Sequence, residues 1–165
     1  MTLRQTDIIE PGENVMDSRD IIARIEALEE FEQAAKNEAV EIKARIEGME
    51  GEGPDSEAAM KIWTAADGTE YAETVDWTED EYGELKRLRD LAEEASGSPD
   101  WTYGETLIRD SYFEDYAREL AEECGMVKDD VTWPNNCIDW EKAADMLKQD
   151  YMSVDFGDET YWIRA

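Results

Sequence analysis

Apolar residues recur at alternating steps of three and four between Ile21 and Met49, and only Glu32 interrupts the series. This spacing predicts a long α-helix with a heptad-like apolar stripe, and Asp17 and Ser18 can cap its start. One such helix cannot bury its own stripe, so we expect it to pack against a second helix of the chain or against a second copy of the chain. In the second case, the oligomerising residues are Ile21, Ile25, Leu28, Ile42 and Ile46.

A second helix is predicted from Thr78 to Ala95. Thr78 and Glu81 have the spacing of a capping box, and Ser96-Gly-Ser-Pro99 ends the apolar pattern. The two helices can form an antiparallel hairpin. Between them we expect a short amphipathic helix over residues 56–66 and a short strand or packed loop over 69–77.

The last third of the chain alternates helix and strand signals. Asp110 or Ser111 can cap one helix, and Gly125 suits the position just after its end. Asp139 can cap another helix, and two apolar runs around Gly157-Asp158 predict a β-hairpin. The fold class expected is therefore α+β and mainly helical. Its parts are a flexible leader over residues 1–16, a coiled-coil-like helical hairpin over 17–99, and a compact α+β domain over 100–165.

The chain is strongly acidic over its whole length. Its 165 residues include 44 Asp and Glu against 16 Lys and Arg, so the formal charge is −28. Residues 1–100 hold 28 acids and 10 bases, and residues 101–165 hold 16 acids and 6 bases. The charge therefore belongs to the whole surface and not to a tail. With 41% hydrophobic and 10% aromatic residues, the chain has enough apolar material to fold.

This charge argues against several partners. Direct nucleic-acid binding needs clustered Lys and Arg, and an anionic membrane would repel the same surface. We find no apolar run long enough to span a bilayer and no signal-peptide pattern, so we expect a cytoplasmic protein of a host cell.

The chemical motifs of enzymes are weak in this chain. It has no His, the commonest general base and metal ligand, and its Cys124 and Cys137 are interpreted as free, small core residues. Residues 130–141 have the length of a calcium loop, but Asn135 stands where that loop needs Gly. We expect no catalytic residue, no metal and no cofactor.

Acidic residues at helical spacing form rows on the predicted helices, because residues three and four apart share one helix face. Duplex DNA carries about two negative charges per base pair, so the net charge equals that of roughly 14 base pairs. Such rows can replace phosphates in the basic groove of a DNA-binding protein. The candidate residues for binding a partner are Glu26, Glu29, Glu30, Glu79, Asp80, Glu84, Glu114, Asp115, Glu119, Glu122, Glu123, Asp129 and Asp130.

The runs Leu107–Gly125, Cys137–Val154 and Thr160–Arg164 resemble proteins carried by phages and other mobile elements. They also look like the closing domain of the ArdA antirestriction family, in which an acidic helix leads to a final aromatic strand ending in Arg. The similarity covers roughly residues 107–164. It implies an acidic DNA mimic that blocks type I restriction-modification enzymes, often as a dimer.

The sequence thus favours a non-enzymatic DNA mimic that inhibits a basic DNA-binding defence enzyme, either restriction-modification or CRISPR, with a homodimer possible. Two alternatives stay open. One is a scaffold protein that oligomerises through residues 21–49. The other is an acidic globular protein from a salt-adapted host.

Overall fold

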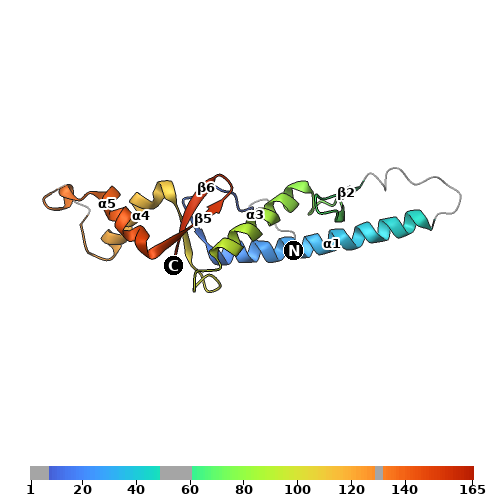
Figure 1. Cartoon of the computed structure of the whole chain (residues 1–165), viewed down its shortest axis with the longest axis horizontal. Coiled ribbons are helices and arrows are strands. Elements are labelled where there is room, and N and C mark those ends of the chain that lie inside the picture. Colours follow the sequence, from blue (N-terminus) through green and yellow to red (C-terminus); the bar gives the residue numbers. More distant parts are fainter. Residues whose placement is uncertain (1–7, 49–60, 129–131) are drawn as a thin grey trace. The chain divides into compact units, whose positions relative to one another are not determined.

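The structure is a computed structural model that describes residues 8–48, 61–128 and 132–165. Over these residues the chain is a mainly helical α+β protein with small antiparallel sheets and a β-hairpin at its C-terminus (Figure 1). The predicted fold class is confirmed.

The chain divides into two compact units at Ile22/Ala23 and at Arg87/Leu88. We call the first and last parts together the sheet unit, and the part from Ala23 to Arg87 the helical unit. The predicted boundary at residue 100 differs from this division in two ways. The units separate at Arg87/Leu88, and the N-terminal part belongs to the same unit as the C-terminal part.

The helical unit is built around the predicted long helix, α1 (Ser18–Glu47), which contributes its residues from Ala23 onward. Leu28, Ala35 and Ile42 of its apolar stripe are buried. Ala39 and Ile42 form a small core with Ala72, and Ile46 and Ile62 pack against it.

Two short strands, β2 (Ile62–Thr64) and β3 (Glu70–Ala72), pair antiparallel in the helical unit. Gly68 has a φ of 86° in the turn between them, a conformation that suits glycine. The helix predicted for residues 56–66 is wrong where it can be compared, since 62–64 are extended and hydrogen-bonded to a partner strand. Residues 56–60 lie outside the described residues.

The second predicted helix is confirmed as α3 (Glu79–Ala95). The Thr78 N–H donates to Glu81 Oε2 at 2.9 Å, and the Asp80 N–H donates to Thr78 Oγ1 at 3.2 Å. These bonds satisfy donors at the helix start, as in a capping box.

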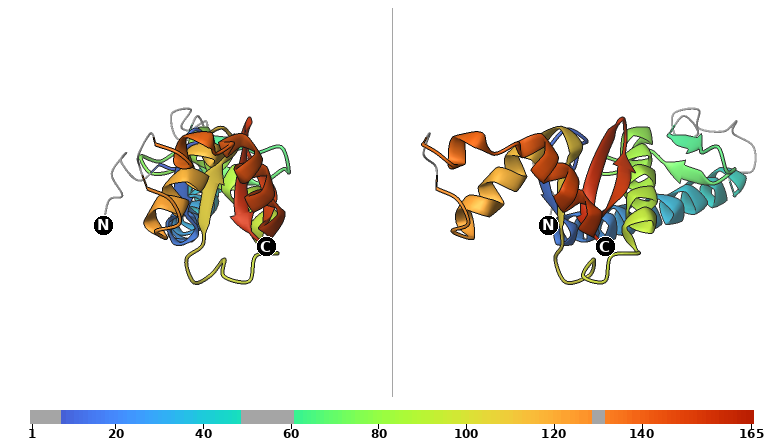
Figure 2. Two further views of the ribbon diagram at one scale, coloured as in Figure 1. Left: turned by 90° about the vertical axis from the view of Figure 1, so that its left-hand side faces the viewer. Right: turned by 60° about the vertical axis from the view of Figure 1, so that its left-hand side comes forward.

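The sheet unit contains a four-stranded antiparallel sheet in the order β1-β4-β6-β5. The β5–β6 hairpin, drawn in red in Figure 2, turns at Gly157, whose φ is 62°. This two-residue turn was predicted. The strands are β1 (Val15–Asp17), β4 (Thr106–Arg109), β5 (Tyr151–Phe156) and β6 (Glu159–Arg164).

Two helices pack on one face of this sheet, where Ile108, Phe113, Ala117, Ala144 and Tyr151 form a core cluster. The helices and the short 3-10 turns around them are η2 (Asp110–Tyr112), α4 (Phe113–Glu123), η3 (Asn135–Cys137), α5 (Trp140–Leu147) and η4 (Lys148–Asp150).

The ends of both helices follow the sequence signals in part. Asp139 caps α5 by accepting the Lys142 N–H at 3.1 Å, and Gly125 follows the end of α4 with a φ of 70°. The expected cap at Asp110 or Ser111 is wrong, because η2 occupies these residues and no side chain caps α4.

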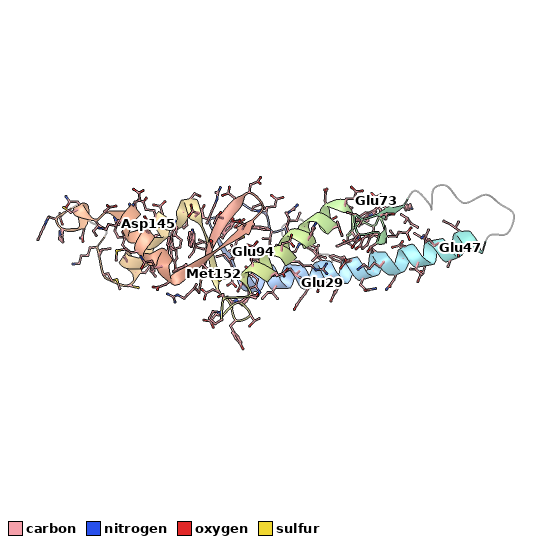
Figure 3. All side chains as sticks on the ribbon, in the orientation of Figure 1. Glu29, Glu47, Glu73, Glu94, Asp145 and Met152 are labelled. Atoms are coloured by element: carbon pink, nitrogen blue, oxygen red, sulfur yellow. The ribbon has the colours of Figure 1, made fainter. Side chains whose placement is uncertain are left out.

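The C-terminal end of α3 lies beside the edge strand β5. Glu94 Oε2 accepts the Asp155 N–H at 2.9 Å, and the Met152 side chain lies against Gly97. Figure 3 labels Glu94 and Met152 at this contact. The carboxylate covers a backbone donor on the open side of β5, which protects that edge from pairing with another strand.

The predicted flexible leader is wrong at its C-terminal end. Met16 of β1 pairs with Leu107 of β4, and the Arg109 N–H donates to the Asn14 carbonyl at 2.9 Å. Gly12 donates its N–H to the Tyr161 hydroxyl at 3.0 Å. Residues 12–17 are therefore held by strands at least 89 positions away, and no local sequence pattern predicts such pairing.

Candidate interaction surfaces

The first acidic row lies on α1 in the helical unit. Glu26, Glu29 and Glu30 are all exposed. Figure 3 labels Glu29 on this helix. Leu28 and Ala35 are fully buried. Glu29 and Glu30 follow Glu26 by three and four residues, so the three acids lie close together on the helix surface, and none of them is three or four residues from Leu28 or Ala35. The burial of the apolar stripe thus places the acids in solvent on a helix fixed by its packing. We call Glu26, Glu29 and Glu30 the α1 row.

The start of α3 presents a second acidic group. Glu79 and Asp80 are exposed, and together with Trp63, Glu73 and Thr78 they line an open pocket of about 330 Å³. Figure 3 labels Glu73 beside β3. The two predicted acids therefore share this pocket with Glu73, which is not among the predicted residues.

Glu84 does not belong to an acidic surface, and its predicted role is wrong. Its carboxylate is buried and accepts both Arg24 Nε at 2.8 Å and Arg24 Nη2 at 2.7 Å. This bidentate ion pair joins α3 to α1 inside the helical unit. A signal for it exists in the sequence, because Glu84 precedes Leu88 by four residues and so occupies the apolar stripe of its helix.

Glu32 is a second buried acid of the helical unit. Its Oε1 accepts the Tyr71 hydroxyl and Lys36 Nζ, both at 3.0 Å. Burial of Tyr71 raises the pKa of its hydroxyl group, and the hydrogen bond to Glu32 raises it further. This network is therefore part of the core and offers nothing to a partner.

The third acidic row lies on α4 in the sheet unit. Tyr112 donates its hydroxyl to Glu119 Oε2 at 2.7 Å, and this bond raises the pKa of Tyr112. Arg118 Nη2 approaches Glu114 Oε1 at 4.0 Å, which leaves one weakly paired cation among several acids. We call this group the α4 row: Glu114, Asp115, Glu119 and Glu123 are exposed, and Glu122 is half-buried.

The predicted pair Asp129 and Asp130 lies outside the described residues. The other candidate acids fall into two sets, one on each unit. The α1 row, Glu79 and Asp80 belong to the helical unit, and the α4 row belongs to the sheet unit.

Both cysteines are exposed, so their interpretation as core residues is wrong. Cys124 follows the last residue of α4 and Cys137 ends η3, where the backbone leaves the packed helices. The same segment holds Trp133, whose side chain is 79% exposed. Trp133 is not among the residues predicted to bind a partner.

The predicted oligomerisation stripe is covered inside the single chain. Ile21 and Leu28 are fully buried and Ile42 is 6% exposed, while Ile25 and Ile46 are half-buried. Burial of Ile21, Leu28 and Ile42 therefore needs no second copy of the chain. Of the five residues, Ile25 and Ile46 keep part of their surface exposed, and oligomerisation through this stripe stays a prediction.

None of the helices in residues 8–48, 61–128 and 132–165 is long and apolar enough to cross a membrane. In the same residues, no three Asp, Glu or Cys side chains are grouped so that they could hold a metal ion.

Comparisons with protein-family models, curated proteins and solved structures give no match for this chain. The resemblance of residues 107–164 to antirestriction proteins therefore stays a prediction.

Proposed function

We propose that the chain is a non-enzymatic DNA mimic that inhibits a DNA-binding defence enzyme, of the restriction-modification or CRISPR type, by occupying its basic groove. The observation that carries this proposal is the α4 row, a set of exposed carboxylates on a helix whose other side is packed in the core. The exposed α1 row supports it from the helical unit.

Fixed helical carboxylates suit a basic groove for two reasons. Grooves that bind DNA present Lys and Arg to phosphates, and a helix holds its side chains in a regular series without a further loss of backbone entropy on binding. Several cations of the chain are already paired with its own acids, as Lys43 is with Glu70 and Arg109 with Glu159. Since the chain has 44 acids and only 16 Lys and Arg, its surface keeps a large acidic excess that can attract an external basic protein.

The scaffold alternative loses its main support, since the apolar stripe of α1 is buried within the chain. The alternative of a salt-adapted globular protein also accounts for the acidity. It predicts a protein that unfolds at low salt and binds no basic partner.

A competition assay tests the proposal. The purified chain is titrated into a type I restriction enzyme and, separately, into a CRISPR effector complex, each bound to labelled duplex DNA. We expect DNA to be displaced from one of them, with an apparent affinity that falls steeply as salt rises, because the contacts are between charges.

The α4 row is then reversed by Glu114→Lys, Asp115→Lys and Glu119→Lys in one variant. We expect much weaker displacement, because three repulsive contacts replace three attractive ones. The matched control keeps the charge, with Glu114→Asp, Asp115→Glu and Glu119→Asp, and should displace DNA like the wild type. Unchanged inhibition after reversal of this row and of the α1 row would contradict the proposal.

A further inference from the structure

Trp133 differs from the other tryptophans of the chain. Its side chain is 79% exposed, whereas Trp77 is fully buried and Trp101 is 8% exposed. The remaining three are half-buried. A large aromatic side chain in water keeps apolar surface that contact with a partner can bury, and tryptophan is enriched among the residues that dominate binding energies.

The two half-buried tryptophans of the sheet unit each carry a cation from the chain itself. Arg118 Cζ lies 5.4 Å from the ring centroid of Trp140, and Lys148 Nζ lies 4.9 Å from that of Trp162. Within residues 8–48, 61–128 and 132–165, no Lys or Arg side chain lies over the ring of Trp133. The face of the exposed Trp133 ring can therefore bind a cation, as the rings of Trp140 and Trp162 bind Arg118 and Lys148 of the chain itself.

The backbone around Trp133 is hydrogen-bonded. The Asn136 N–H donates to the Thr132 carbonyl at 3.1 Å, and the Cys137 N–H donates to the Pro134 carbonyl at 2.9 Å. The first bond closes a turn that contains Trp133, and the second closes a turn directly after it. A side chain on such a backbone loses less freedom on binding than one on an open loop.

The charge around this segment favours a cation. Glu123 ends α4 before it, and Asp139 and Glu141 follow it at the start of α5, all three exposed. The exposed Lys128 and Lys142 only partly offset them. An anionic partner such as a nucleic-acid base and its phosphate is disfavoured by the same charge.

We propose that Trp133 receives an arginine side chain of the basic partner, with the planar guanidinium stacked on the indole face. Arginine is expected over lysine because its guanidinium is planar and weakly hydrated, whereas the lysine ammonium is a compact, strongly hydrated charge. This inference rests on the proposed function for the existence of a basic partner. It adds the residue that anchors this partner and the side chain that is recognised.

The test follows the indole N–H signals of the full-length ¹⁵N-labelled protein by NMR at about 0.15 M salt. The probes are a tri-arginine peptide and a tri-lysine peptide, both amidated, and a short oligothymidine. Trp133→Phe identifies the Trp133 signal. We expect this signal to shift with tri-arginine at a concentration about fivefold lower than with tri-lysine, while the signal of buried Trp77 stays in place.

Calorimetry with tri-arginine gives a second readout. Trp133→Ala should weaken binding about fivefold. The matched control is Tyr103→Ala, since Tyr103 is also 79% exposed in the sheet unit, and it should change nothing. Both residues are exposed, so neither change should disturb folding, which circular dichroism checks.

The inference is overturned if the Trp133 signal does not respond to tri-arginine, responds equally to tri-lysine, or responds to oligothymidine. These outcomes leave the proposed function standing as long as reversal of the α4 row abolishes the displacement of DNA. If the displacement assay fails instead, the response of the indole signal still shows whether Trp133 binds tri-arginine in preference to tri-lysine.

Discussion

Arg24 and Glu84 form a charged pair that is buried within the fold and not exposed on the surface. Their side chains are 8% and 6% exposed, and two hydrogen bonds join them. Removal of one partner takes both of these hydrogen bonds from a charge that stays buried. We expect Glu84→Ala to lower the free energy of unfolding by about 3–5 kcal/mol, measured by urea denaturation.

A matched control for this prediction is Glu114→Ala. Glu114 faces Arg118 at 4.0 Å and both side chains are about half exposed, so its removal should cost less than about 1 kcal/mol. Equal losses for the two variants would show that Glu84 contributes no more than a surface acid.

Asp110 links stability to pH. Its Oδ1 accepts Lys148 Nζ and Trp162 Nε1, both at 2.7 Å, and these bonds lower the pKa of the carboxyl group. A lowered pKa in the folded state stabilises the fold above the unfolded pKa of about 3.9, and this contribution is lost as pH falls through the folded pKa. The side chain of Asp110 is 52% exposed, so solvent screens part of the effect.

We therefore expect Asp110→Asn to lower the urea midpoint at pH 7 and to approach the wild-type midpoint as pH falls below about 4. Urea titrations between these pH values measure the difference. Asp145→Asn, at an exposed position of α5, is the control and should have little effect. A difference between Asp110→Asn and the wild type that does not change with pH would argue against the pKa shift as its cause.

The long helix α1 stabilises the helical unit through its packed stripe. Ile42 is 6% exposed and shares a core with Ala39 and Ala72. Ile42→Asp places a charge in this core, and we expect it to cost more than about 3 kcal/mol while the oligomeric state stays that of the wild type. Thermal unfolding and light scattering after size-exclusion chromatography measure the two quantities.

Val40 provides the control on the same helix, since its side chain is 68% exposed and Val40→Asp should change stability little. Dispersal of an oligomer by Ile42→Asp without loss of helicity would favour the scaffold alternative. That result would mean that the stripe also contacts a second copy of the chain.

The net charge of −28 acts on the molecule as a whole. Self-repulsion destabilises a compact acidic protein, and salt screens it over about 10 Å at 0.1 M and about 3 Å at 1 M. We expect the midpoint of thermal unfolding to rise with sodium chloride, while displacement of DNA from the partner weakens over the same range. A midpoint independent of salt would show that the acids are too far apart to repel one another. Complete unfolding at low salt would favour the salt-adapted alternative.

Much of the helical part of the fold was predictable, because helical signals are local. The bounds of α1 and α3 follow from apolar spacing and from local caps, since Asp17 Oδ1 accepts the Arg19 N–H at 2.8 Å and the Thr78 N–H donates to Glu81 Oε2 at 2.9 Å. Ser18, the other predicted cap of α1, bonds instead to Glu105, which is distant along the chain in the sheet unit. The exposure of the α1 row follows from the same spacing, since the buried stripe leaves the rest of the helix surface to solvent.

The sheet and the buried charges were not predictable in this way. The three residues of β1 are extended only because β4, some 90 positions later, pairs with them, and the β2 strand replaces a predicted helix because β3 pairs with it. Glu84 had the spacing of a core position, but only the position of Arg24 shows that a charge is tolerated there.

By itself, then, the sequence determined the acidic surface, the main helices and the C-terminal hairpin, because charge, helical period and two-residue turns depend on neighbours along the chain. The tertiary structure decided which strands pair, which acids are buried, and that Trp133, Cys124 and Cys137 are exposed. Burial and strand pairing depend on residues far apart in the chain, and the free energy of such contacts is set only when the whole chain has folded.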